Sequence, residues 1–137
     1  MKIVNSLSKV NIEEIKEVYH SVGWTKHNEE NIKLIFNASH IMTFVLINNK
    51  VVGIGRALTD GIFNAAIYDV VVHQDYQGNG IASHLLTDIL NKLEGISCIH
   101  LISTTANEAF YHKFGFKKVK TGMAKYRNPK LIAEYLE

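Results

Sequence analysis

Several residue types and patterns that would point to particular protein classes are scarce in this sequence. One cysteine in 137 residues excludes an internal disulfide and a cysteine zinc cluster. No run approaches the roughly 18 apolar residues of a transmembrane helix, and the N-terminus lacks the pattern of a signal peptide. The net charge is only +2, without a basic stripe for nucleic acid. We therefore expect a cytoplasmic protein without a membrane or nucleic-acid partner.

The residues that are present describe an ordered globular chain. Apolar residues make up 47% and charged residues 20%, and the length favours a single domain over residues 1–137. The seven histidines do not follow a metal-ligand spacing, so we expect no metal. Cys98 lies in an apolar stretch and is predicted to be a small buried residue.

Hydrophobic periodicity predicts regular elements along the whole chain. The first half of the chain is predicted to form a strand over residues 1–7, a helix capped by Asn11 with Glu14 as its capping partner, a helix after Asn28, and strands over 41–47, 50–58 and 65–73. The second half is predicted to form a long helix over 81–93, a strand over 97–103, a helix over 107–114, a strand pair over 116–120 and 122–127, and a helix that begins at Pro129. Three consecutive strands precede the long helix, which argues against a doubly wound fold and favours an α+β fold.

The turn between the third of these strands and the long helix has the composition of an anion site. The strand is apolar on both faces, as expected for a central strand. Gly78 and Gly80 allow the backbone to turn tightly, and the first amides of the helix at Ile81 then point at a ligand. An ordinary strand–helix connection without a ligand could have the same composition. The sequence motif in the turn must therefore distinguish the two alternatives.

Three phosphate-binding motifs compete for this turn. A P-loop requires lysine after its second glycine, but Ile81 follows Gly80. A dinucleotide fingerprint requires a third glycine where Ser83 stands. The remaining pattern, Gln/Arg-x-x-Gly-x-Gly/Ala, is matched by Gln77, Gly80 and Ala82. In this it resembles the acyl-CoA signature of the GCN5-related N-acetyltransferase (GNAT) superfamily.

A second stretch strengthens the resemblance. Residues 109–116 read Ala-Phe-Tyr-His-Lys-Phe-Gly-Phe, similar to the tyrosine helix of that superfamily, and they follow the turn at the expected spacing. The family often has asparagine seven residues before this tyrosine. Thr104 stands there instead, so Tyr111 is carried over and Asn107 is not. Stretches 22–25, 60–65 and 68–70 loosely resemble aralkylamine-type members.

The resemblance implies a fold and a donor-binding site. The fold is the acyl-CoA N-acyltransferase fold, a central mixed, mostly antiparallel sheet flanked by helices. The cosubstrate is acetyl-CoA, whose pantetheine arm would lie along the central strand as an added strand while turn amides hold the pyrophosphate. The implied binding residues are Val70, Val71, Val72, Gln77, Gly78, Asn79, Gly80, Ile81 and Ala82.

Tyr111 and Asp69 are the candidate catalytic residues. A phenol is protonated at neutral pH, so Tyr111 is predicted to donate a proton to the departing thiolate. The alternative for Tyr111 is core packing. Asp69 interrupts an apolar strand and is predicted to accept the amine's proton or bind its ammonium. The alternative is a carboxylate held by backbone amides at an irregularity of the strand. His73 is predicted to be a surface or pyrophosphate-side residue.

Three further residues are candidates for binding the acceptor: Trp24, Arg56 and Asp60. Trp24 could equally be a core residue at a helix end, and Arg56 could face solvent. The predicted function is acetyl transfer from acetyl-CoA to a primary amine of a small molecule, by direct attack in a ternary complex. A protein N-terminal or lysine acetyltransferase and a non-catalytic acyl-CoA-binding module are the alternatives. A homodimer is also left open.

Overall fold

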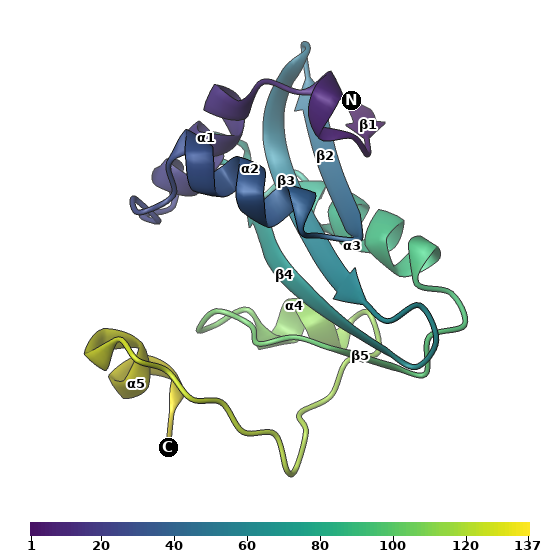
Figure 1. The fold of residues 1–137 in the computed structure, drawn as a ribbon, viewed down its shortest axis with the longest axis vertical. Helices are drawn as coiled ribbons and strands as arrows, with labels where there is room; N and C mark the ends of the chain where they lie inside the picture. The colour runs from purple at the N-terminus through teal and green to yellow at the C-terminus, as the bar shows by residue number, and fades with distance from the viewer. The chain divides into compact units, whose positions relative to one another are not determined.

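The computed structural model describes the whole chain, Met1–Glu137, as two compact units, Met1–Leu101 and Ile102–Glu137 (Figure 1). No helix in either unit has the length and apolar character needed to cross a membrane. The single domain expected over residues 1–137 stays a prediction.

A five-stranded sheet forms the centre of the first unit. Its strands are β1 (Lys2–Val4), β2 (Ile41–Ile47), β3 (Lys50–Thr59), β4 (Asn64–Val72) and β5 (Cys98–His100), and they pair in that order. The pairs from β1 to β4 are antiparallel, and β5 runs parallel to β4. The predicted α+β fold with a mixed, mostly antiparallel sheet is therefore confirmed.

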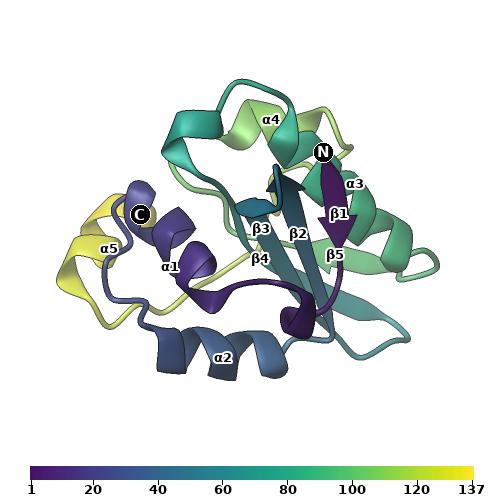
Figure 2. The same ribbon diagram turned by 90° about the horizontal axis from the view of Figure 1, so that it is seen from above.

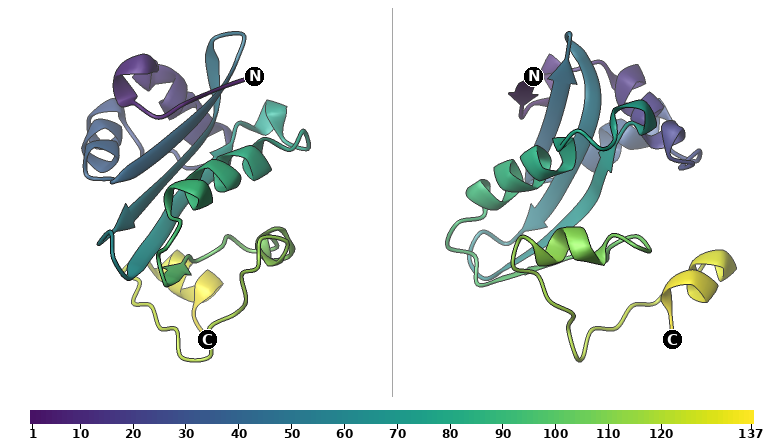
Figure 3. Two further views of the ribbon diagram at one scale, coloured as in Figure 1. Left: turned by 90° about the vertical axis from the view of Figure 1, so that its right-hand side faces the viewer. Right: turned by 180° about the vertical axis from the view of Figure 1, so that it is seen from behind.

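Helices cover both faces of this sheet (Figure 2). The helices α1 (Ile12–Ser21) and α2 (Glu29–Asn37) lie on one face, and α3 (Ile81–Lys92) crosses the other (Figure 3). Short 3-10 turns cover Leu7–Lys9 and Gln74–Tyr76. This arrangement follows from the apolar stripe of each helix, which must be buried against the sheet.

Asparagine side chains begin both α1 and α2. Asn11 accepts from the amide of Glu13, and Asn28 forms a capping box with Asn31. The predicted capping partner of Asn11 was wrong. The Glu14 carboxylate instead accepts from the Val51 amide at 3.0 Å. Val51 belongs to β3, which packs against α1, so its amide takes the place of the Asn11 amide as the partner of Glu14.

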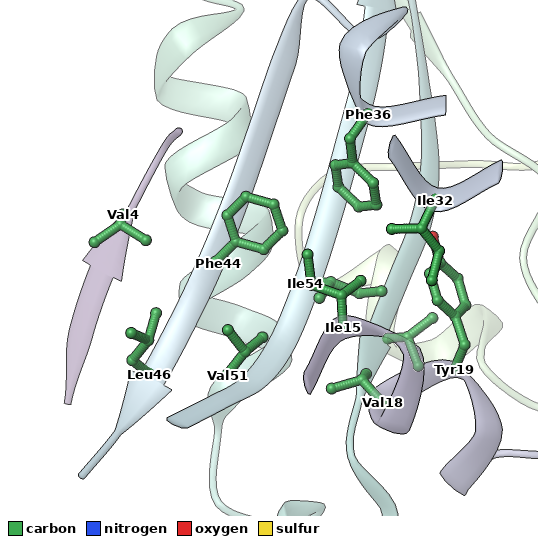
Figure 4. Close-up of a cluster of buried hydrophobic side chains, with 11 residues drawn as sticks. Val4, Ile15, Val18, Tyr19, Ile32, Phe36, Phe44, Leu46, Val51 and Ile54 are labelled. Carbon is green, nitrogen blue, oxygen red and sulfur yellow. The ribbon is translucent and has the colours of Figure 1, made fainter. Parts of the chain in front are cut away.

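The main core lies between the sheet and the helices α1 and α2 (Figure 4). Phe36 from α2 packs on Phe44 from β2 with ring centroids 5.2 Å apart, and Ile15 and Tyr19 of α1 are fully buried beside Ile54. Each such side chain contributes about 1.5–3 kcal/mol when buried. This packing fixes the position of α1 against the sheet.

A second cluster lies under α3. It includes Val72 of β4 and Ile81 and Leu85 of α3. A Cβ at Gly53 would lie 2.8 Å from Ile81 Cγ2, so glycine allows the start of α3 to approach β3 closely. The end of β4 and the beginning of α3 are thus fixed on either side of the turn that joins them.

The second unit contains two short helices, α4 (Glu108–His112) and α5 (Pro129–Tyr135), joined by irregular chain. Both helices were predicted, and Asn128 caps α5. The strand pair predicted over residues 116–120 and 122–127 was wrong, since these residues form no strand. Their side chains are mostly exposed, and a lone hairpin is marginal without a sheet to pack on.

Two strand predictions were too long, and one burial prediction was wrong. The first strand ends at Val4, and the strand predicted over residues 97–103 is limited to Cys98–His100. Cys98 is exposed, because β5 is a short strand at the edge of the sheet.

Candidate active site

The turn from β4 into α3 has the backbone of an open loop. Gly78 and Gly80 adopt φ angles of 82° and 78°, in the left-handed region that glycine occupies without strain. A Cβ at either position would meet no atom within 4 Å. Conformation, not crowding, therefore requires glycine here, and the space above the turn is free for a ligand.

The beginning of α3 differs from the beginnings of α1, α2 and α5. The helices α1, α2 and α5 begin with an asparagine whose side chain accepts a backbone amide, whereas α3 begins at Gly80 without a side-chain cap. Backbone amides of residues 77–83 donate to no protein acceptor. Free amides at a helix N-terminus form an anion site.

The polar side chains of the turn leave these amides free. The Gln77 side chain donates to the carbonyl of Val72 at 3.1 Å, and the Asn79 side chain donates to the carbonyl of Tyr76 at 3.1 Å. Both side chains therefore hold the loop's shape. His73 supports the same loop, because its Nδ1 accepts from the Asp75 amide at 3.1 Å.

One edge of β4 is open within the first unit. The strand β5 pairs only with Asn64, Ala65 and Ala66, while β3 pairs with β4 as far as Val72. Residues 67–72 thus have no strand partner in this unit on the edge away from β3. An extended ligand with amide groups, such as pantetheine, can pair there as an added strand.

A β-bulge interrupts β4 along this open edge. The register with β3 shifts between Ile54 and Arg56, so that Asp69 and Val70 both lie opposite Gly55. Asp69 has a φ of 56°, a left-handed conformation that aspartate tolerates better than most residues. The next residue but one, Val71, packs in the core beneath α1 and α2.

The Asp69 carboxylate is held by side chains from two other elements. Its Oδ2 accepts from Arg56 Nε at 2.7 Å and from the Tyr19 hydroxyl at 2.9 Å, while Oδ1 has no protein partner. The side chains of Arg56 and Asp69 are only 15% and 13% exposed. Arg56 therefore does not face solvent, and backbone amides do not hold Asp69.

Aromatic rings surround the Tyr19 donor. His27 stacks on Tyr19 at 4.0 Å with an interplanar angle of 12°, and Trp24 stacks on it at 5.8 Å. Burial and the neighbouring Asp69 carboxylate raise the pKa of Tyr19 far above its usual value. Burial lowers the pKa of His27, which keeps this imidazole neutral at neutral pH.

Sequence reasoning missed Tyr19 and His27 as members of this cluster. The spacing of Tyr19 from Ile12, Ile15 and Val18 predicts only a place on the apolar stripe of the helix. A buried tyrosine hydroxyl normally requires a polar partner, however, and that signal was available. His27 carried no such signal. Trp24 is brought to this cluster and is partly buried, which agrees with a packing role beside Tyr19.

Asp60 forms neither a hydrogen bond nor an ion pair with Asp69. Its Oδ1 accepts from the amides of Ile62, Phe63 and Asn64 at 2.7–3.0 Å. These backbone hydrogen bonds lower the pKa of Asp60 to about 2. Asp60 thus organises the β3–β4 turn, and its role in acceptor binding stays a prediction.

Tyr111 belongs to the second unit. Its ring packs against Phe110 at 5.1 Å and Phe116 at 5.9 Å. Burial raises the pKa of Tyr111, so the phenol is protonated at neutral pH. Its hydroxyl makes no hydrogen bond to another residue. Tyr111 is not one of the residues of the first unit, and its catalytic role stays a prediction.

Comparison with known proteins identifies the family. The sequence model of the Acetyltransferase (GNAT) family matches residues 9–116. This chain belongs to the GNAT family. An uncharacterized N-acetyltransferase, ycf52, of Pyropia yezoensis is 33% identical over 126 residues, covering 88% of this chain and 72% of the relative. The predictions of this family and of an N-acetyltransferase are confirmed.

Other GNAT relatives agree with this assignment. Serotonin N-acetyltransferase 2, chloroplastic, of Oryza sativa subsp. japonica is 29% identical over 127 residues, covering 86% of this chain and 64% of that protein. The structure of a GNAT family acetyltransferase from Streptococcus pneumoniae TIGR4 superposes with a TM-score of 0.76 at 25% identity, covering 93% of this chain and 98% of that chain.

Family membership implies the use of acetyl-CoA, and two features of the first unit fit it. The free amides of the turn suit a pyrophosphate, and the open edge of β4 suits the pantetheine amides. No group of three histidine, cysteine, aspartate or glutamate side chains is placed to bind a metal ion.

Proposed function

We propose that this GNAT enzyme transfers the acetyl group of acetyl-CoA to the primary amine of a small molecule, by direct attack in a ternary complex. The free Oδ1 of Asp69 is the observation that carries the proposal. Asp69 itself stands on the bulge of β4, the strand whose unpaired edge would receive the pantetheine arm. A carboxylate oxygen without a protein partner is an acceptor for the N–H groups of an amine.

In this proposal, backbone groups bind the acetyl donor, acetyl-CoA. Amides of residues 77–82 would bind the pyrophosphate, with about 0.3–1 kcal/mol per favourable charge from the helix dipole. Backbone groups of Val70, Val71 and Val72 would pair with the pantetheine amides. A backbone amide at the bulge would donate to the thioester oxygen as negative charge develops there.

The reaction forms one bond and breaks another. Asp69 Oδ1 accepts an N–H of the amine and thereby directs the nitrogen lone pair toward the thioester carbon. The amine's proton leaves to Asp69 or to water. The C–N bond forms, the C–S bond breaks, and Tyr111 protonates the thiolate. The role of Tyr111 rests on the resemblance of residues 109–116 to the tyrosine helix of the family.

The names of the relatives do not decide between a small acceptor and a protein, since they include a serotonin N-acetyltransferase of rice and a histone acetyltransferase of Glycine max. One feature of this chain favours a small acceptor. The aromatic side chains of Trp24 and His27, both partly buried, adjoin the Tyr19–Asp69 pair, and an apolar organic amine can pack against such rings.

A thiol-release assay across a panel of amines tests the proposal. The panel contains aralkylamines, polyamines, amino sugars, and peptides with a free N-terminus or a lysine. We expect the largest kcat/KM for a small amine and a loss of at least about 10-fold for Asp69→Asn. Higher kcat/KM for the peptides would contradict a small-molecule acceptor.

The matched control for Asp69→Asn is Asp88→Asn. The Asp88 carboxylate accepts from Thr43, Asn5 and Lys92 and is also partly buried, but it lies on α3 away from the bulge. We expect Asp88→Asn to lower the melting temperature and to leave kcat per folded molecule unchanged. An equal loss of rate in both variants would show that the effect of Asp69→Asn is structural.

A further inference from the structure

Tyr19 carries a polar group into a helix face that is otherwise apolar. The buried residues of α1 are Ile15, Val18 and Tyr19, and all three are 0% exposed. Phenylalanine would fill the same volume without a hydroxyl to satisfy. The Tyr19 hydroxyl instead donates to Asp69 Oδ2 at 2.9 Å, across 50 positions of sequence. The hydroxyl therefore has a specific partner in the candidate active site.

Two donors from different elements meet on the same oxygen of Asp69. Tyr19 reaches Oδ2 from α1, and Arg56 reaches it from β3 at 2.7 Å. Asp69 itself stands on a bulge, where the regular sheet pairing that would orient a strand residue is interrupted. Two fixed donors on Oδ2 determine the plane of the carboxylate and hence the direction in which Oδ1 points.

Both donors are themselves held in place. Arg56 also donates to Ser39 Oγ at 3.3 Å, and its guanidinium lies 5.1 Å from the centre of the Tyr68 ring. The Tyr19 ring is covered by the stacked His27 ring. The carboxylate is thus oriented by a network that extends through α1, β3 and β4.

The charges in this network balance. Arg56 carries one positive charge and Asp69 one negative charge, so the pair offers an arriving ammonium little net attraction. What the pair does offer is a hydrogen-bond acceptor in a fixed direction. Misplacement of a reacting group by about 1 Å can cost about 100-fold in rate, which makes orientation the larger contribution of this pair.

We propose that Tyr19 is a positioning residue of this acetyltransferase, which fixes Asp69 Oδ2 together with Arg56 so that Oδ1 alone receives the acceptor amine. This inference rests on the proposed function, in which Asp69 binds the amine. Tyr19 does not touch the amine and acts only through Asp69.

Tyr19→Phe tests this role, since it removes the hydroxyl and keeps the ring. We expect kcat to fall by about 10–100-fold, with the KM for acetyl-CoA within about 2-fold of wild type, because the donor turn is untouched. The control is Ile15→Val, which disturbs the same buried face of α1 without contact to Asp69. It should leave kcat per folded molecule unchanged. A wild-type kcat for Tyr19→Phe would overturn the proposal.

A double-mutant cycle with Asp69→Asn separates this proposal from the proposed function. Asparagine also tolerates the left-handed backbone at this position. If Tyr19 acts through Asp69, Tyr19→Phe causes little further loss of kcat in the Asp69→Asn background. A loss of the same size in both backgrounds would show that Tyr19 acts by another route and would overturn the positioning role alone. A wild-type rate for Asp69→Asn itself would remove the proposed function and this inference together.

Arg56→Lys supplies a second variant that does not disturb α1. Lysine keeps the positive charge but lacks the planar guanidinium, so it cannot reproduce the Nε contact and the contact to Ser39 together. We expect kcat to fall with an unchanged KM for acetyl-CoA. A wild-type kcat here would show that fixed donors on Oδ2 are dispensable, and would overturn the proposal even if Tyr19→Phe failed to fold.

Discussion

The two units of the chain are stabilised by different kinds of contact. Every buried apolar residue belongs to the first unit, and the last of them along the chain is Leu93. The helices α4 and α5 bury no residue. Aromatic pairs such as Phe110–Phe114 and Tyr126–Tyr135 order the second unit. The donor turn and Asp69 are therefore fixed by a packed core, whereas Tyr111 is ordered by local contacts.

The donor turn of the first unit should show the largest effect of a single substitution. Gly80→Glu places a side chain at a φ of 78° and a negative charge at the free amides of α3. We expect the affinity for CoA to fall at least about 100-fold, or about 2.8 kcal/mol, as measured by calorimetry. Gly95→Glu is the control, because Gly95 also has a positive φ, 87°, beyond the other end of α3. Unchanged CoA affinity for Gly80→Glu would remove the turn from the binding site.

The hydroxyl of Tyr111 should matter for rate although the second unit is sparsely packed. Tyr111→Phe keeps the ring contacts to Phe110 and Phe116, so we expect stability to be unchanged. General acid catalysis predicts a fall in kcat of about 10- to 10⁴-fold, with CoA affinity little changed. Tyr126→Phe, in the same unit, serves as the control. A wild-type kcat for Tyr111→Phe at every pH, with chemistry rate-limiting, would leave Tyr111 as a packing residue.

Truncation of one phenylalanine in each unit tests the difference in packing directly. Phe36 is fully buried, so Phe36→Ala should lower the free energy of unfolding by about 3–5 kcal/mol. Phe110 in α4 is only partly buried, so Phe110→Ala should cost less than about 1.5 kcal/mol. Urea unfolding measures both values. Equal losses would show that the second unit contributes as much packing energy as the first.

Asp60 should give the smallest effect, visible only through pH. Its folded-state pKa is about 2, below the ~3.9 of an unfolded aspartate. Its contribution to stability is therefore present above pH ~4 and is lost as the pH falls from ~4 toward 2. Asp60→Asn should lower the melting temperature slightly at pH 7, and the difference from wild type should shrink as the pH falls toward 2. A difference that persists unchanged at pH 2 would argue against this ionised carboxylate as its source.

The sequence predicted the features that depend on neighbouring residues. The glycine turn and the helix that follows it come from a local pattern of apolar residues and glycines, and the structure has both. The helix beginning at Pro129 was likewise readable from its own residues. These elements need no information from distant parts of the chain.

Features that depend on long-range contacts could not be predicted. The bulge at Asp69 arises from a register shift against β3. An acid in an apolar strand allowed an irregularity there as an alternative, but the sequence of β4 alone could not establish it. The partners of Asp69 lie 13 and 50 positions away, so their meeting is a property of the folded sheet and α1. The Glu14 prediction failed for the same reason, because the amide of Val51 comes from a distant strand.

The uncapped beginning of α3 links donor binding to the stability of the protein. Asparagine completes α1, α2 and α5 from within the chain, but the amides at Gly80 have no such partner. On the proposed binding mode, the pyrophosphate of the donor would serve as the missing cap. A ligand that binds only the folded state stabilises it by about 2.7 kcal/mol at 100 times its Kd. The melting temperature of this enzyme should therefore rise with the concentration of acetyl-CoA, so that the supply of the donor would shift the balance between folded and unfolded enzyme.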